Sequence, residues 1–144
     1  MMPLKTLKLD LRATPEELMR SVALLESFGR ENQFDEKSTF GLMLALEECG
    51  ANVIHHAYQD RPQERFCVRF EATDEQLTIE IRDTGSPFDP TAARLENPDI
   101  DPDDRAPGGW GIQLVRRYMD DIVYRRDGNE NVLRMVKRVA NSST

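Results

Sequence analysis

Two successive helix patterns with no strand between them constrain most what this chain can fold into. The first begins at Thr14-Pro15-Glu16-Glu17, an N-cap followed by a proline at the first helical position, and runs to Gly29. The second is expected from about Asp35 to Ala57, because an apolar stripe recurs there at helical spacing. This order differs from the strand–helix alternation of a Rossmann domain. The chain also lacks the GxxxxGK[ST] motif of a P-loop nucleotide site.

The other periodic segments alternate apolar and polar residues, as half-buried strands do. They cover residues 7–11, 66–70, 77–81, 122–124 and 132–136. A third helix should contain Ile112, Val115 and Met119 and precede the last two strands. Short turns at 73–75 and 127–129 favour antiparallel hairpins. We therefore expect an α/β (α+β) fold: a two-layer sandwich of a mixed, largely antiparallel sheet with three main helices on one face.

Composition narrows the class of protein. The 144 residues suit one domain, residues 1–144, and the formal net charge of −7 argues against nucleic-acid binding, which needs a basic surface. Cys49 and Cys67 lack CxxC spacing, so we expect buried free thiols instead of a zinc or redox site. No apolar run reaches the ~20 residues of a membrane helix. The N-terminus lacks the apolar run of a signal peptide, so the chain is expected to be cytoplasmic, without membrane contact.

The second helix carries the first candidate site. Glu48, Asn52 and His56 follow one another at spacings of four residues and should share one helix face. A carboxylate and an amide oxygen one turn apart can serve a magnesium ion and an attacking hydroxyl or water together, because magnesium takes few protein oxygens. The same pattern also suits an ordinary solvated helix face.

Two glycine-containing segments are the other candidates. Asp83-Thr84-Gly85 ends a predicted strand, where the carboxylate could accept a hydrogen bond from an exocyclic amine such as that of adenine and Gly85 could let a flat ring approach. Gly108-Gly109-Trp110-Gly111 precedes a helix, whose N-terminus suits phosphate. Alone, the first also fits a common turn and the second a hinge. From Thr84 to Pro107 the chain loses its periodicity, and a loop this long is usually functional or disordered.

Together and in this order, these segments resemble the GHKL (Bergerat-fold) ATPase superfamily. Residues 47–58 resemble its N box, residues 83–89 its first glycine box and residues 108–112 its second. The branch most similar is that of the anti-sigma-factor serine/threonine kinases. That branch shows a helix with Glu-x-x-x-Asn and His-Ala-Tyr, and a closing strand rich in Asn and Leu, which Asn131-Val132-Leu133 fits. The resemblance covers nearly the whole chain.

The resemblance implies a role for each matching residue. Glu48 would be the general base, Asn52 would bind the Mg²⁺ that bridges the ATP phosphates, and Asp83 would hold the adenine amino group above Gly85. Residues from about 88 to 107 would form the ATP lid, and Arg105 could reach the γ-phosphate. His56 would orient the site or pack at the helix end instead of accepting phosphate. The remaining nucleotide-site residues would be Phe88, Gly108, Gly109, Gly111 and Ile112.

The function implied is that of an ATP- and magnesium-dependent protein serine/threonine kinase. As an anti-sigma factor it would bind a sigma factor, phosphorylate a STAS-type anti-anti-sigma protein and form a homodimer. Two alternatives stay open. One is an ATP-loaded binding module without phosphate transfer, and the other is an ATP hydrolase, because the same carboxylate can activate a hydroxyl or a water.

Overall fold

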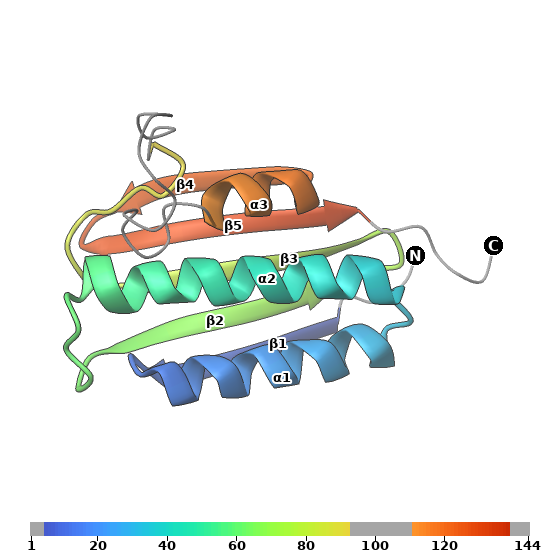
Figure 1. The fold of residues 1–144 in the computed structure, drawn as a ribbon, viewed down its shortest axis with the longest axis horizontal. Helices are drawn as coiled ribbons and strands as arrows, with labels where there is room; N and C mark the ends of the chain where they lie inside the picture. The colour runs from blue at the N-terminus through green and yellow to red at the C-terminus, as the bar shows by residue number, and fades with distance from the viewer. Residues whose placement is uncertain (1–4, 93–110, 139–144) are drawn as a thin grey trace, which may run out of the picture.

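The computed structural model describes residues 5–92 and 111–138, and in them five strands form one open sheet (Figure 1). The strands are β1 (Lys5–Arg12), β2 (Arg65–Ala72), β3 (Gln76–Asp83), β4 (Asp121–Asp127) and β5 (Glu130–Arg138). Their order across the sheet is β1-β2-β3-β5-β4, and all four neighbouring pairs are antiparallel. The largely antiparallel sheet that the sequence predicts is therefore confirmed, with no parallel pair among the described strands.

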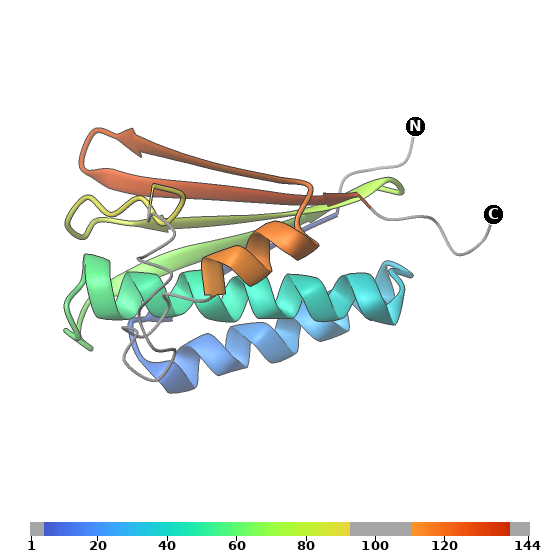
Figure 2. The same cartoon turned by 45° about the horizontal axis from the view of Figure 1, so that its top comes forward.

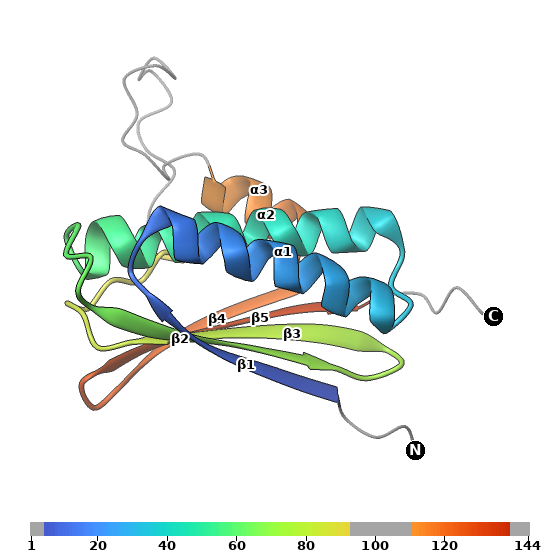
Figure 3. The ribbon, with the colours of Figure 1, turned by 90° about the horizontal axis from the view of Figure 1, so that it is seen from below.

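Three helices cover one face of this sheet, as Figures 2 and 3 show. They are α1 (Pro15–Glu31), α2 (Glu36–Asn52) and α3 (Gly111–Tyr118), and α2 continues into a π-helical turn, η1 (Val53–Ala57). Both long helices begin at side-chain caps, and the first of these is the Thr14 cap that the sequence predicts. Thr14 Oγ1 accepts a hydrogen bond from Glu17 N, and the side chain of Asp35 accepts one from Ser38 N. The two-layer sandwich is thus confirmed.

The hydrophobic core lies between α2 and the middle of the sheet. Leu77, Ile79 and Ile81 of β3 are fully or almost fully buried, and so are Leu42 and Leu46 of α2. The opposite face of the sheet carries the polar residues of the same strands, in the alternation that a half-covered sheet requires.

The register of the sheet and the end of α2 place the candidate residues. Asp83, the last residue of β3, pairs with Asn131 near the start of β5. The C-terminal end of the second helix lies at this same end of the sheet, since Ser86 N donates to the carbonyl oxygen of Ala57 at 2.9 Å. After η1 the chain reverses through Gln59 and Asp60, which both have positive φ. Among the described residues, no helix is long and apolar enough to cross a bilayer.

Candidate functional site

A small cavity lies between the end of α2 and the ends of β3 and β5. Its volume is about 20 Å³, room for about one water. Its walls come from α2, η1, β3, β4, β5 and the segment after β3, and they comprise Cys49, Asn52, Val53, Ala57, Ile81, Asp83, Phe88, Pro90, Tyr124, Asn131 and Leu133. The fold therefore brings Asn52 of the second helix together with Asp83 and Phe88 of the first glycine segment.

Asp83 lines this cavity, and one of its carboxylate oxygens has no hydrogen bond from a described residue. The residue is 4% exposed, and its Oδ1 accepts hydrogen bonds from Gly85 N at 2.9 Å and from Asn131 Nδ2 at 2.8 Å. Oδ2 accepts none from the described part of the chain. Burial raises the pKa of Asp83, and the bonds from Asn131 and Gly85 oppose that rise. This arrangement leaves Oδ2 able to accept a hydrogen bond from a ligand.

Gly85 packs against the end of the second helix. A Cβ added to Gly85 would lie 2.5 Å from the carbonyl oxygen of Ala57 and 2.7 Å from its carbonyl carbon. This close approach accounts for the glycine in structural terms. The ring contact that the sequence suggests for Gly85 stays a prediction, since Gly85 does not line the cavity and its Cβ side is filled by Ala57.

Asn131 lines the cavity, although its sequence pattern predicts no role for it at the site. It is 4% exposed, and its side-chain amide joins Asp83, the segment after β3 and strand β4. Nδ2 donates to Asp83 Oδ1 and to Ser86 O, and Oδ1 accepts from Phe88 N and from the Tyr124 hydroxyl. The available signal was a polar residue on the inward face of a strand, two positions before Leu133.

Tyr58 contacts the segment after β3 through its hydroxyl group. Its side chain is fully buried, and its hydroxyl donates to Arg65 O and accepts from Thr84 N at 2.9 Å. These two bonds connect the chain that follows η1 with the residue directly after Asp83. The tyrosine of the His-Ala-Tyr motif therefore has a structural role at the site.

Glu48 and Asn52 have the unsatisfied polar groups that a ligand would use. Glu48 Oε2 is buried and has no hydrogen-bond partner in the described part of the chain. Burial chiefly raises the pKa of Glu48; Glu47 raises it further, and His56 lowers it. Asn52, 6% exposed, makes no side-chain hydrogen bond with described residues. An orphaned carboxylate oxygen one turn from an unpaired amide fits a magnesium ion that takes few protein oxygens.

This donor set differs from that of a structural metal site. Among the described residues, no group of three His, Cys, Asp or Glu is placed to hold a metal. A magnesium ion at Asn52 would therefore need waters and phosphate oxygens for most of its coordination.

Of the three residues expected to share one helix face, Asn52 lines the cavity, whereas Glu48 and His56 do not. His56 lies close enough to Glu48 to lower its pKa. Its ring stacks on Phe88 with centroids 4.7 Å apart and planes 10° apart, and it does not line the cavity. The π-helical turn accounts for this position of His56, because it rotates less per residue than an α-helix and so shifts residues 53–57 around the helix axis. His56 thereby packs against the segment that follows β3.

The second glycine segment is only partly described. Gly111 begins α3, and Ile112 is 5% exposed within the hydrophobic core instead of lining the cavity. Arg105, Gly108 and Gly109 lie outside the described residues, as do most of residues 88–107, so their predicted roles stay predictions. At the start of that segment, Arg116 of α3 donates to Thr91 O at 2.6 Å.

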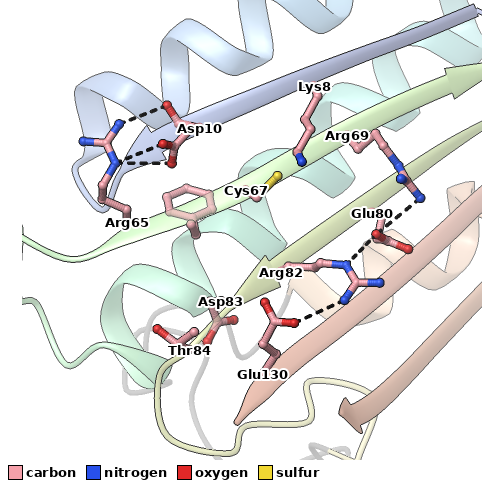
Figure 4. A pocket seen from close by; sticks show the side chains of 11 residues that line it. Lys8, Asp10, Arg65, Cys67, Arg69, Glu80, Arg82, Asp83, Thr84 and Glu130 are labelled. Carbon is pink, nitrogen blue, oxygen red and sulfur yellow. Dashed lines mark hydrogen bonds and ion pairs between the residues drawn. The ribbon is translucent and has the colours of Figure 1, made fainter. Parts of the chain in front are cut away.

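A larger cavity, about 270 Å³, lies on the other face of the sheet (Figure 4). Its three arginines already pair with carboxylates: Arg82 with Glu80 at 2.8 Å, Arg69 with Glu80 at 3.5 Å, and Arg65 with Asp10 at 3.2 Å. Because these cations are neutralised by neighbours, the groove offers less to an anionic ligand than its size suggests. The smaller cavity is lined by Asn52 of the second helix and by Asp83 and Phe88, so we take it as the candidate site.

Known proteins share this sequence pattern and fold. The chain is 29% identical over 125 residues to the serine/threonine-protein kinase BtrW of Bordetella bronchiseptica, covering 86% of this chain and 88% of that protein. It is 25% identical over 120 residues to the serine-protein kinase RsbW of Oceanobacillus iheyensis, covering 81% and 76%. The predicted enzyme class, a protein serine/threonine kinase, agrees with the names of both relatives.

A solved structure confirms the fold. The crystal structure of the RsbU and RsbW domains of a Mycobacterium tuberculosis protein superimposes with a TM-score of 0.68 at 15% identity, covering 94% of this chain and 32% of that one. Residues 11–137 match the family described as the histidine kinase-like ATPase domain. With the GHKL resemblance of its motifs, this match establishes that the chain belongs to the histidine kinase-like ATPase domain family.

Proposed function

We propose that this chain is an ATP- and magnesium-dependent serine/threonine protein kinase that acts as an anti-sigma factor. Its substrate would be a STAS-type anti-anti-sigma protein, and a sigma factor would be its second partner. The observation that carries the kinase proposal is made one helical turn before Asn52, where the buried Oε2 of Glu48 has no hydrogen-bond partner among the described residues. The family of ATPase domains and the two relatives named as kinases support it.

Glu48 supplies the base for the transfer. The hydroxyl oxygen of a partner serine or threonine attacks the γ-phosphorus and the bond to the β–γ bridging oxygen breaks, giving a phosphoprotein and ADP. The hydroxyl proton passes to the Glu48 carboxylate. Burial makes this carboxylate a stronger base than an exposed glutamate, because it raises its pKa. Magnesium, when bound beside Asn52, neutralises charge on the phosphates.

The base of ATP would be held at Asp83, where Oδ2 can accept a hydrogen bond from the adenine amino group. The cavity of about 20 Å³ is far smaller than a purine. Phe88 and Pro90 form part of its wall. ATP binding would therefore displace the segment from Ser86 to Pro90, and this movement would open the cavity toward the helices.

One labelling experiment tests the kinase proposal against both alternatives. The protein is incubated with γ-labelled ATP, Mg²⁺ and a STAS-domain protein encoded by a neighbouring gene. Label on that partner, lost in Glu48→Ala, is the result we expect. Free phosphate with an unlabelled partner would instead identify a hydrolase, and ATP binding without either product would identify a binding module. Absence of ATP binding would overturn the nucleotide site itself.

The proposed assembly is tested separately. We infer a homodimer, as the GHKL resemblance implies, and light scattering of the purified chain measures its mass directly. A mass close to that of one 16.5 kDa protomer would contradict this inference. Binding of a candidate sigma factor, with and without ATP, would test the anti-sigma role in the same preparation.

A further inference from the structure

The side-chain amide of Asn131 uses all of its hydrogen-bonding capacity at the candidate site. A carboxamide has two N–H donors and an oxygen with two lone pairs. Nδ2 donates at 2.8 Å to Asp83 Oδ1 and at 2.9 Å to Ser86 O. Oδ1 accepts from Phe88 N at 3.2 Å and from the Tyr124 hydroxyl. These four bonds also fix the orientation of the amide, because exchanging its O and N would place donor against donor.

The consequence for Asp83 is an asymmetric carboxylate. Oδ1 already accepts two N–H groups, from Asn131 and from Gly85, whereas Oδ2 accepts none from the described residues. Two donors on Oδ1 favour the ionised carboxylate and oppose the rise in pKa that burial causes, so they favour Oδ2 as an acceptor over Oδ2 as an O–H donor. A buried acceptor of this kind distinguishes bases by polarity: it favours an amino group and disfavours a carbonyl at the same position.

We propose that Asn131 is a specificity-determining residue of the nucleotide site. By donating to Asp83 Oδ1 it keeps Oδ2 as the acceptor that selects an amino-bearing base over a base with a carbonyl at that position. This inference rests on the proposed ATP-binding function. Asn131 is a positioning residue, since its effect on the base passes through Asp83.

Three other charged or titratable groups lie near this pair. Arg126 of β4 donates to Gly85 O at 2.9 Å and lowers the pKa of Asp83, whereas Glu130 of β5 raises it. The Tyr124 hydroxyl meets Asn131 on its oxygen side. Arg126 donates its hydrogen bond to Gly85 O and not to Asp83. In the described part of the chain, Asn131 is therefore the side chain that donates a hydrogen bond to Asp83.

Asn131→Asp tests the proposal with almost no change in shape. The variant replaces the Nδ2 donor with a carboxylate oxygen facing Asp83 Oδ1, and two carboxylates in contact share a proton. Asp83 can then carry a proton and lose its acceptor-only character. Isothermal titration with ATP and with inosine triphosphate, whose base carries a carbonyl in place of the amino group, measures base selectivity as a ratio of dissociation constants. Asn129→Asp is the matched control, since it adds the same charge at an exposed turn two residues away.

We expect the wild type and Asn129→Asp to prefer ATP equally. In Asn131→Asp we expect that ratio to fall by about tenfold or more. A folded Asn131→Asp that keeps the wild-type ratio overturns the proposal, even if both nucleotides bind more weakly, because a purely structural role would weaken them together. A wild type that binds ATP without preference over inosine triphosphate also overturns it, whereas a wild type that binds no ATP overturns the proposed function as well.

Tyr124→Phe keeps the test decisive if Asn131→Asp does not fold. The variant removes one donor to Asn131 Oδ1 and retains the ring and the Phe88 N–H bond. The loosened amide should lower the ATP preference by about two- to fivefold, in the range of one weakened hydrogen bond. An unchanged ratio in a folded Tyr124→Phe, together with an unfolded Asn131→Asp, would count against a role in selectivity and leave Asn131 with a structural role alone.

Discussion

Gly85 approaches the carbonyl group of Ala57 so closely that no side chain fits between them. An added Cβ would lie 2.5 Å from the carbonyl oxygen, and this contact joins the residue after the Asp83 turn to the end of the second helix. Because the obstacle is backbone, it cannot rotate away. We expect Gly85→Ala to lower the free energy of unfolding by about 1–3 kcal/mol through overpacking, and to weaken ATP binding by displacing Asp83. Urea denaturation and calorimetric titration measure the two effects.

Gly128 provides the control for this change. It has φ +60° at the turn between β4 and β5, and a Cβ added there would meet nothing within 4 Å. Asn tolerates the left-handed conformation, so Gly128→Asn should cost less than about 1 kcal/mol. It should also leave ATP binding unchanged. Equal losses of stability in the two variants would contradict the steric explanation.

Tyr58→Phe should separate the hydroxyl of Tyr58 from its packing. The change removes the donor to Arg65 O and the acceptor of the Thr84 N–H, and leaves the buried ring in place. We expect a loss of about 1–3 kcal/mol in the free energy of unfolding, because a buried polar group is left without a partner. Tyr118→Phe is the control, since no described residue forms a hydrogen bond with that hydroxyl. A smaller loss for Tyr58→Phe than for Tyr118→Phe would refute the role of the hydroxyl.

The sequence predicted the sandwich because its elements carry local signals. The helix cap at Thr14 and the apolar stripe of the second helix are short-range patterns, and the structure confirms them. The position of His56 was not predictable in this way, because a π-helical turn leaves no mark in residue periodicity. Asn131 contacts Asp83 only through the pairing of β3 with β5, which depends on tertiary register.

Glu48→Gln should abolish phosphate transfer while leaving ATP binding largely intact. An amide cannot accept the hydroxyl proton, and general-base removal typically costs about 10²–10⁴ in rate. Glu47→Gln is the matched control, because Glu47 is the exposed neighbouring carboxylate. Single-turnover labelling of the partner measures the rate. Loss of transfer in Glu47→Gln instead would assign the base to the other glutamate.

Glu48→Gln should also stabilise the fold at neutral pH. The pKa of Glu48 is raised in the folded state, so folding favours its protonated form. The contribution of protonated Glu48 to the free energy of unfolding is present at acid pH. It is lost as pH rises from the ordinary glutamate pKa through the raised pKa of the folded state. Glu48→Gln removes this loss of stability, because an amide side chain does not ionise. Its free energy of unfolding should exceed that of the wild type at pH 7, and the difference should shrink toward acid pH in urea titrations.

Glu47 should influence the transfer rate through the pKa of Glu48. Burial is the main cause of the raised pKa of Glu48, and Glu47 adds to it by charge repulsion. Glu47→Gln removes that repulsion, so Glu48 ionises at lower pH. The acid limb of the pH–rate profile should move to lower pH, and the plateau rate should stay within about twofold of the wild type, since the base itself remains. A shift to higher pH, or no shift, would argue that the acid limb reports another group.

Asp83→Asn should reverse the hydrogen-bond polarity of the base site with little effect on the fold. The Asn oxygen can keep the bonds from Asn131 Nδ2 and Gly85 N, which places an NH₂ donor where Oδ2 lies. An adenine amino group would then meet another donor, so ATP affinity should fall by about 10²-fold or more. Inosine triphosphate, with a carbonyl there, should lose much less.

Asp127→Asn, at the exposed end of β4, changes the same charge away from the site and should leave both affinities as in the wild type. Calorimetric titration of both nucleotides measures the pair of constants, and equal losses for ATP and inosine triphosphate would show that Asp83 does not face the base.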